Sequence, residues 1–250
     1  MTELVHYSVD RGIARVELDS PHNRNALSRQ LCSELSAHLR TASADPAVRA
    51  VELTHTGSVF CAGADLSETS TGPSITEVMI GLLGQIVEMP KPVIARLDGH
   101  VRAGGLGLVG AADIALASRT VSFAFTEVRI GVAPAMITLT TLGRMTERAA
   151  SRYLLTGETF DATTAAEVGL ITAAVDDLDG ATAELHDQFR KCSPQGLAET
   201  KPLTTRATRE AIASRAADLA ALSARLFGND EAREGMAAFL EKRPPSWALD

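Results

Sequence analysis

The chain contains two short glycine-rich stretches, GSVFCAGADL at residues 57–66 and DGHVRAGGLG at residues 98–107. Each follows a strand-like run and leads into a helix-like run, and each is rich in small residues that let other groups approach the backbone closely. One peptide N–H from each stretch could therefore point at the same oxygen atom. Two such donors form an oxyanion hole, which predicts an enzyme that acts on a carbonyl compound.

Composition excludes several other classes of protein. The 250 residues are 45% hydrophobic and 22% charged, which is typical of a globular protein, and the net charge of −7 argues against a nucleic-acid partner. The three cysteines are too few and too far apart for a disulfide framework or a cysteine metal site, and the six histidines show no metal-binding spacing. The first residues lack the features of a signal peptide, and the apolar stretch 93–117 is interrupted by charged residues. We therefore expect a cytoplasmic protein with no metal and no membrane span.

The hydrophobic pattern alternates between strand and helix periods in the first half of the chain. A hairpin is expected at 5–18, and strands at 50–54 and 92–97 each precede one glycine-rich stretch. Further elements are expected as helices at 28–41, 75–88 and 106–112 and a strand at 114–117. This order predicts a parallel sheet flanked by helices, with the chemistry at the carboxyl ends of the strands.

The second half of the chain has a mainly helical pattern. Helices are expected at 138–145, 147–155, 163–168, 180–191, 195–206, 209–227 and 230–240. We interpret them as a helical layer rather than an independent domain. The segment 67–74, rich in Ser and Thr, is expected to be a loop that contributes to the wall of an acyl pocket.

Several motifs, in this order, identify the sequence as similar to the enoyl-CoA hydratase/isomerase (crotonase) superfamily. They are PHNRNAL at 21–27, FCAGADL at 60–66, DGHVRAGG at 98–105, FTEVRIGVAP at 125–134, LTGE at 155–158, AEVGL at 166–170, REGM at 233–236 and FLEKR at 239–243. The resemblance implies a crotonase-like α/β fold, with a spiral core of ββα repeats and a helical C-terminal layer. It implies a core at 1–190 and a C-terminal helical region at 191–250 that serves oligomerisation and CoA contact, in a homotrimer or a dimer of trimers.

The resemblance also implies the catalytic residues. Members of the superfamily bind acyl-CoA thioesters and stabilise an enolate in an oxyanion hole, whose N–H donors fall on Ala64 and Gly104. One of the two glutamates used by the hydratases matches Glu127, between apolar neighbours. The other falls on Gly107, which has no side chain to offer.

The CoA part of the substrate is expected to contact residues from three places in the chain. On the resemblance these residues are Arg24, Ala26, Ala62, Asp65, Leu66, Phe239 and Lys242, with Phe239 and Lys242 reaching the nucleotide of a neighbouring subunit. In the superfamily, lysines often flank the first glycine-rich stretch; this chain has Ser58 and Ser67 at those positions. No separate cofactor is expected, because coenzyme A is part of the substrate.

Three functions remain open from the sequence. The motifs favour an enoyl-CoA hydratase that adds water to a 2-enoyl-CoA. A Δ3,Δ2-enoyl-CoA isomerase that uses Glu127 alone is the mechanistic alternative, because moving a proton needs one carboxylate. A non-catalytic acyl-CoA-binding protein is the third. Dinucleotide binding at Gly105-x-Gly107-x-x-Gly110 is disfavoured, because six residues separate this motif from the preceding strand.

Overall fold

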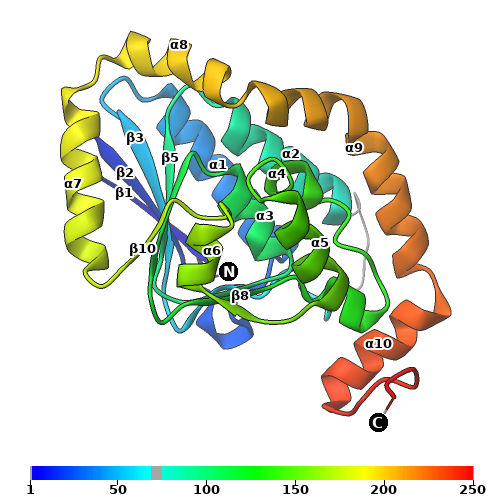
Figure 1. Ribbon diagram of the computed structural model, residues 1–250. Helices are drawn as coiled ribbons and strands as arrows, with labels where there is room; N and C mark the ends of the chain where they lie inside the picture. The colour runs from blue at the N-terminus through cyan, green and yellow to red at the C-terminus, as the bar shows by residue number, and fades with distance from the viewer. Residues whose placement is uncertain (1, 69–74, 250) are drawn as a thin grey trace.

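Figure 1 presents the protein as a computed structural model that describes residues 2–68 and 75–249. Most of the loop expected at 67–74, with the part of the acyl pocket assigned to it, lies outside the described residues. The expected helices and strands are present, but the helix expected at 138–145 covers only Thr138–Thr141. Five short strands of the described chain were not expected: Val59–Cys61, His100–Arg102, Ser122–Ala124, Phe160–Asp161 and Ala173–Val175.

A six-stranded sheet forms the centre of the molecule, in the order β1-β2-β3-β5-β7-β10. The strands are β1 (Val5–Asp10), β2 (Ile13–Leu18), β3 (Ala50–His55), β5 (Val93–Leu97), β7 (Ile114–Ser118) and β10 (Ala173–Val175). The hairpin of β1 and β2 is antiparallel, as expected, and all the other neighbours are parallel. The parallel strands therefore present their carboxyl ends at one edge of the sheet.

A second, smaller sheet begins where three strands of the large sheet end. It has the order β4-β6-β8-β9, with β4 (Val59–Cys61), β6 (His100–Arg102), β8 (Ser122–Ala124) and β9 (Phe160–Asp161). The strands β4, β6 and β8 follow β3, β5 and β7 along the chain, which produces the strand–strand–helix repeat of the expected fold. Because β4 and β6 pair in parallel, with Val59 opposite His100, the two glycine-rich stretches lie side by side.

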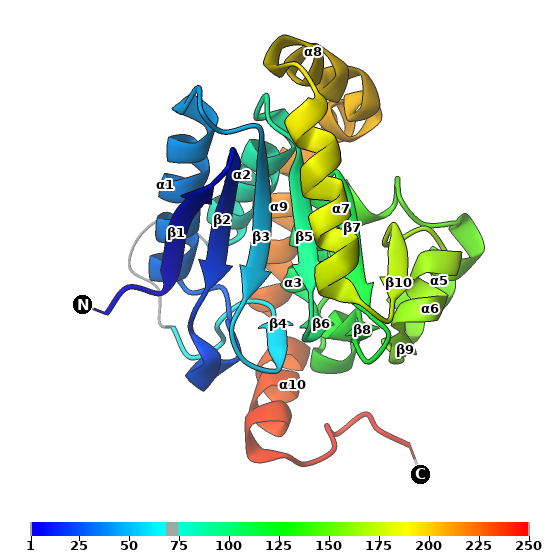
Figure 2. The same ribbon diagram turned by 90° about the vertical axis from the view of Figure 1, so that its left-hand side faces the viewer.

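Helices cover both faces of the large sheet. In Figure 2, α7 lies in front of the sheet, and α1, α2, α3 and α9 lie behind it. Their bounds are α1 (Arg29–Ala44), α2 (Ile75–Glu88), α3 (Gly104–Ala111), α4 (Thr138–Thr141), α5 (Glu147–Thr156), α6 (Ala162–Glu167), α7 (Leu178–Lys191), α8 (Pro194–Thr204), α9 (Arg206–Phe227) and α10 (Asp230–Glu241), with short 3₁₀ helices η1 (Pro21–Asn23) and η2 (Thr126–Ile130).

Local sequence explains how α1 begins and which face it buries. The Ser28 side chain accepts a hydrogen bond from the Leu31 N–H, which satisfies one of the free donors at the helix start. Leu31, Leu35 and Leu39 form a stripe at a spacing of four residues and are fully buried. The expected N-cap and apolar face of this helix are therefore confirmed.

Lys201 fixes α8 to the core. Its ammonium group is 2.8 Å from the Asp113 carboxylate and donates to the carbonyl oxygens of Ile86 and Lys91 at 2.8 and 2.9 Å. The Lys201 side chain is only 3% exposed, so this contact stands in place of the apolar packing that α8 otherwise lacks. The buried ion pair holds the start of the C-terminal region against the end of α2.

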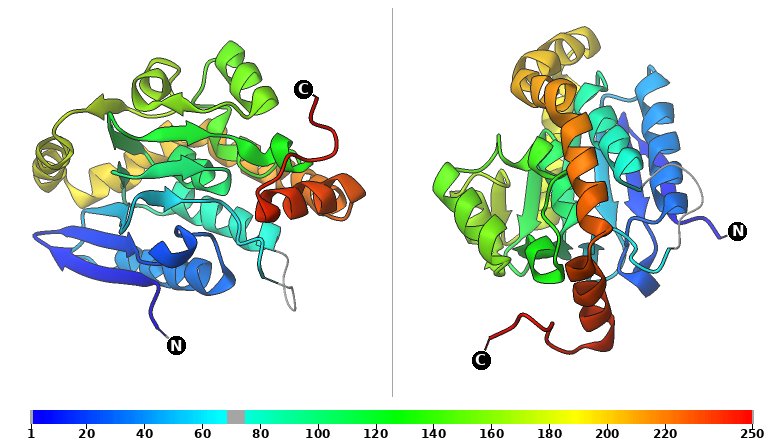
Figure 3. Two further views of the ribbon diagram at one scale, coloured as in Figure 1. Left: turned by 90° about the horizontal axis from the view of Figure 1, so that it is seen from below. Right: turned by 90° about the vertical axis from the view of Figure 1, so that its right-hand side faces the viewer.

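The C-terminal helices extend beyond the core. The long helix α9 packs against α2 and α4, and α10 then lies at the end of the molecule that carries the small sheet (Figures 2 and 3). There α10 packs against η2. The C-terminal region thus reaches the carboxyl ends of the parallel strands.

Candidate active site

One cavity of about 620 Å³ brings together most of the residues expected at the site. Its walls come from η1, the two glycine-rich stretches, η2 and the segment after it, α9 and α10. The expected catalytic residues Glu127, Ala64 and Gly104 all line it. The topology thus gathers parts of the chain that are more than a hundred residues apart.

The two glycine-rich stretches meet at Gly63 and Gly104. A Cβ atom added to Gly104 would lie 3.4 Å from the Gly63 Cα, and one added to Gly63 would lie 3.2 Å from the Gly104 backbone nitrogen. Within the described part of the chain, the backbone N–H groups of Ala64 and Gly104 donate no hydrogen bond to the protein. Two neighbouring, unused N–H donors at one cavity are the arrangement that an oxyanion hole requires.

The backbone at Ala103 directs the second donor. Ala103 has φ +46° and ψ −122°, a conformation that costs a residue with a Cβ roughly 1–3 kcal/mol. Its own N–H donates to the Ala124 carbonyl oxygen of β8 at 3.1 Å. The next residue, Gly104, begins α3, so its N–H belongs to the positive end of the helix dipole. The strained turn leaves this N–H available to a ligand.

Glu127 is the candidate acid/base group of the cavity. It lies in η2, and its Oε2 atom is buried with no hydrogen-bond partner among the described residues. Burial raises the pKa of Glu127 to about 7, an effect that its own backbone N–H partly offsets. A carboxyl group whose pKa lies near neutral pH can both accept and return a proton.

Ile137 fills the place of the second carboxylate. A Cβ atom added to Gly107 would lie 2.8 Å from Ile137 Cγ2 and 3.4 Å from Leu83 Cδ1. Ile137 is 2% exposed and lines the cavity together with Glu127. A side chain at residue 107, where the resemblance places a glutamate of the hydratases, would thus meet an apolar side chain from another segment.

Six of the seven residues expected to contact CoA line the same cavity. They are Arg24, Ala26, Ala62, Asp65, Leu66 and Phe239. Phe239 is 56% exposed and reaches the cavity of its own chain. The seventh, Lys242, ends α10 in a left-handed conformation with φ +55° and does not line the cavity.

Asp65 is one of these residues and is held in a fixed orientation. Burial raises its pKa, but hydrogen bonds from Ser67 and from the Asn23 side chain outweigh this effect, so the pKa of Asp65 is lowered overall. Asp65 is thus a carboxylate hydrogen-bonded to other residues, in contrast to the buried Oε2 atom of Glu127, which has no partner among the described residues.

Several lining residues were not expected from the sequence. Arg129 and Arg243 add guanidinium groups to the lining, that of Arg243 being paired with Glu234 and Glu241, while Met79, Met136 and Ile137 add apolar surface. Arg243 belongs to the motif at 239–243, so its place at the site could have been predicted from the sequence. The three apolar residues carried no such signal, because they lie outside the recognised motifs.

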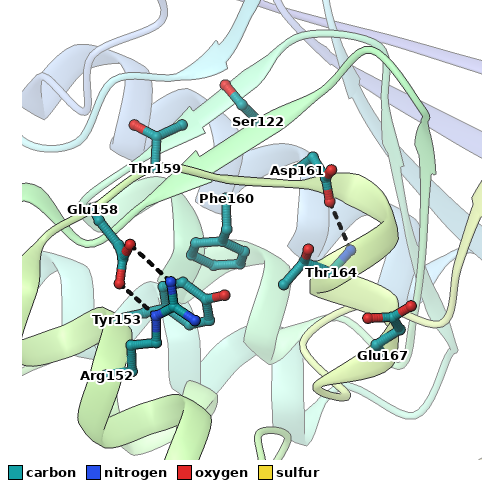
Figure 4. A pocket seen from close by; sticks show the side chains of 9 residues that line it. All are labelled: Ser122, Arg152, Tyr153, Glu158, Thr159, Phe160, Asp161, Thr164 and Glu167. Atoms are coloured by element: carbon teal, nitrogen blue, oxygen red, sulfur yellow. Dashed lines mark hydrogen bonds and ion pairs between the residues drawn. The ribbon is translucent and has the colours of Figure 1, made fainter.

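A second hollow of about 680 Å³ lies beside α5 and β9 (Figure 4). None of the residues expected at the site lines it. Arg152 pairs with Glu158 through two hydrogen bonds of 2.6 and 3.1 Å, and Asp161 accepts from the Thr164 N–H at the start of α6. Because these polar groups satisfy one another, the smaller cavity, where Glu127 Oε2 has no partner among the described residues, is the better candidate.

The structure gives no evidence for a cysteine nucleophile at Cys61, or, among the described residues, for a metal site or a membrane-spanning helix. Burial raises the pKa of the Cys61 thiol to about 12, so this residue behaves as a small apolar side chain rather than a nucleophile. Across residues 2–68 and 75–249, no group of three His, Cys, Asp or Glu side chains could hold a metal ion. No helix in these two described ranges is long and apolar enough to cross a membrane.

Comparisons with known proteins place the chain in a family. The sequence profile of the enoyl-CoA hydratase/isomerase family matches residues 8–249. The chain therefore belongs to this family, and its expected crotonase-type fold is confirmed.

Individual relatives carry names of both hydratases and isomerases. A crystal structure of an enoyl-CoA hydratase from Mycobacterium avium is 54% identical, with a TM-score of 0.92, over 99% of this chain and 100% of that one. The "Probable enoyl-CoA hydratase" of Rhodobacter capsulatus is 32% identical over 96% of each chain. The 1,2-epoxyphenylacetyl-CoA isomerase of Escherichia coli is 29% identical over 99% of each chain.

Proposed function

We propose that this chain is an acyl-CoA enzyme that moves a proton between carbon atoms of an enoyl thioester, as a Δ3,Δ2-enoyl-CoA isomerase does. The proposal is supported by the surroundings of Glu127: its Oε2 atom is buried with no hydrogen-bond partner among the described residues, and a side chain at residue 107 would meet the apolar Ile137. Isomerisation needs one group that removes a proton and returns it, whereas the hydratases of the family use two carboxylates.

The reaction follows from the positions of three groups. The N–H groups of Ala64 and Gly104 hold the thioester oxygen. Ionised Glu127 removes a proton from C2 of a 3-enoyl-CoA, and the electron pair of that C–H bond moves into a dienolate whose negative charge lies on the oxygen. Protonated Glu127 then delivers the same proton to C4, and the double bond forms between C2 and C3. Atoms and charge balance without any other reactant.

Hydration of a 2-enoyl-CoA is the second candidate. The names of the relatives from Mycobacterium avium and Rhodobacter capsulatus favour it. In this case the free Oε2 atom of Glu127 would bind the water molecule and would alone manage its proton.

Ultraviolet absorbance of the conjugated enoyl thioester separates the candidates. We expect purified protein to create this absorbance from a 3-enoyl-CoA, and Glu127→Gln to abolish the change. Loss of absorbance from crotonyl-CoA or a branched 2-enoyl-CoA would instead establish hydration. Binding of all three thioesters without turnover would refute both reactions and support a non-catalytic acyl-CoA-binding protein.

The role of Ile137 can be tested by restoring a carboxylate. Gly107→Glu alone forces the new side chain against Ile137 and is expected to lose activity, because the added Cβ lies 2.8 Å from Ile137 Cγ2. The double variant Gly107→Glu with Ile137→Ala provides room and is expected to gain hydration of crotonyl-CoA. A Gly107→Glu variant as active as the wild type would contradict this explanation.

We also propose that Arg24 and Phe239 contact the CoA part of the substrate and that the C-terminal region supports a homotrimer or a dimer of trimers. The exposed apolar side chains of Phe239 and Leu240 on α10, 56% and 63% exposed, support an interface there. Calorimetric titration with CoA, for the wild type and Arg24→Gln, tests the first part. Light scattering during size-exclusion chromatography tests the second, and a monomer would refute it.

A further inference from the structure

The helix α10 touches η2 backbone to backbone. A Cβ atom added to Gly235 in α10 would lie 2.4 Å from the Ile130 carbonyl carbon and 2.5 Å from its oxygen. A Cβ atom added to Gly131 would lie 2.5 Å from the Glu231 carbonyl oxygen. Each glycine thus faces a backbone group of the other segment, which cannot rotate away as a side chain can. We call this pair of approaches the α10–η2 contact.

The α10–η2 contact acts on the turn that holds Glu127. The N–H groups of Gly131 and Val132 both donate to the Glu127 carbonyl oxygen, the second at 3.1 Å. Ile130 and Gly131, which α10 touches, are therefore part of the same hydrogen-bonded turn as Glu127. A displacement of this turn would move the Glu127 backbone and with it the carboxyl group.

The same helix closes the cavity around Glu127. Gly235, Ala238, Phe239 and Leu240 of α10 all line it, and Ala238 is only 1% exposed. The pKa of Glu127 is raised chiefly by burial. Loss of the covering helix would admit water to this carboxyl group and bring its pKa back toward the ordinary value.

We propose that the α10–η2 contact positions Glu127 for catalysis, with Gly235 as the positioning residue. The C-terminal helix then contributes to the chemical step and not only to substrate contact or assembly. The inference rests on the proposed role of Glu127 as the acid/base group, but it holds equally for isomerisation and hydration. It concerns a residue that does not itself touch the reacting atoms.

Gly235→Ala tests the proposal, with Gly228→Ala as the matched control. Gly228 ends α9 with φ −81°, and a Cβ added there would lie 3.6 Å from its nearest neighbours, an ordinary contact. We expect Gly235→Ala to lower kcat tenfold or more, since small displacements of catalytic groups cost this much, with a smaller change in KM. Gly228→Ala should retain the wild-type values.

The ionisation of Glu127 supplies a readout that is independent of turnover. In carbon-13-labelled protein, with Glu127→Gln used to assign the resonance, the wild type and Gly228→Ala should titrate near pH 7. Gly235→Ala should titrate at a lower pH. If Gly235→Ala keeps both the wild-type kcat and the wild-type titration, the proposal is wrong. If the wild type turns over none of the thioesters, the proposed function is wrong. The pH titration of Glu127 in the wild type and in Gly235→Ala then still tests whether the α10–η2 contact positions this residue.

A second variant covers the case in which Gly235→Ala does not fold. Arg233 is exposed on α10, and Arg233→Gly weakens the helix without adding an atom at the contact. It should shift kcat and the Glu127 titration in the same directions, by smaller amounts. An unchanged titration in folded Arg233→Gly protein, together with a wild-type kcat, would overturn the proposal.

Discussion

Gly63→Ala is the substitution for which the geometry gives the clearest expectation. Gly63 has φ +96°, a conformation that costs alanine roughly 1–3 kcal/mol. The new Cβ would lie 2.8 Å from the Ala103 Cβ and 3.2 Å from the Gly104 nitrogen, and forced contacts of this kind typically cost a further 1–3 kcal/mol. The free energy of unfolding should therefore fall by about 2–6 kcal/mol, the sum of the two costs.

Gly63→Ala should lower kcat by more than the loss of folded protein accounts for. The two groups that the new Cβ would displace are Ala103, which sets the direction of the Gly104 N–H, and the Gly104 nitrogen itself. Loss of one oxyanion donor typically lowers kcat by about 10²–10³-fold. The assay is turnover of the active thioester at a temperature where urea unfolding shows the variant to be folded.

Gly81→Ala is the matched control for this change. Gly81 is an exposed residue of α2, and a Cβ added there meets nothing within 4 Å. Alanine in a helix is more stable than glycine by about 0.5–1 kcal/mol, so this variant should unfold at slightly higher urea and keep its activity. Folded Gly63→Ala protein with wild-type kcat would refute the assignment of the oxyanion hole to these two stretches.

Three further predictions concern the buried ionisable groups. If ionised Glu127 is the base, kcat/KM should fall tenfold per pH unit below about pH 7, and a flat profile between pH 5 and 7 would contradict that role. Folding raises the pKa of Glu127 from 4.5 to about 7. The stability contributed by its neutral form is therefore complete below pH 4.5 and is lost as the pH rises through 7. In urea unfolding, Glu127→Gln should be more stable than the wild type by roughly 3 kcal/mol at pH 8 and similar to it near pH 4.5. Lys201→Met leaves Asp113 without its buried partner and should destabilise the fold by about 3–5 kcal/mol, whereas Lys191→Met, at an exposed position, should change the urea midpoint little.

Elements with a repeated pattern could be predicted from the sequence, and very short ones could not. The stripe of Leu31, Leu35 and Leu39 repeats every four residues along α1, so its period was visible in the sequence. The strands β4, β6 and β8 have three residues each, too few to show an alternation, and they were missed although two of them lie inside the glycine-rich stretches. The helix expected at 138–145 is only the four-residue α4, because the chain after Thr141 turns before it reaches α5.

Some residues of the site could likewise be predicted from the sequence, and others could not. Ala64, Gly104 and Glu127 lie within short motifs whose residues are neighbours in sequence, so their gathering at one cavity could be expected. The contact between Gly235 and Ile130 joins residues more than a hundred positions apart, and glycine at either place has many local explanations. Only the folded chain reveals that this glycine faces the turn that carries Glu127.

Gly107 illustrates why an absent residue cannot be interpreted from sequence alone. The sequence indicates that a second glutamate is missing, which is compatible with a space for water, with a substituted polar group or with an apolar wall. The folded chain selects the last of these, because Ile137 occupies the direction in which a side chain at residue 107 would point. Ile137 also lines the cavity, where a water molecule would find no hydrogen-bond partner on this side chain, whereas an acyl chain would bury apolar surface against it. An apolar side chain at this place therefore supports the proposed isomerisation, which needs one carboxylate.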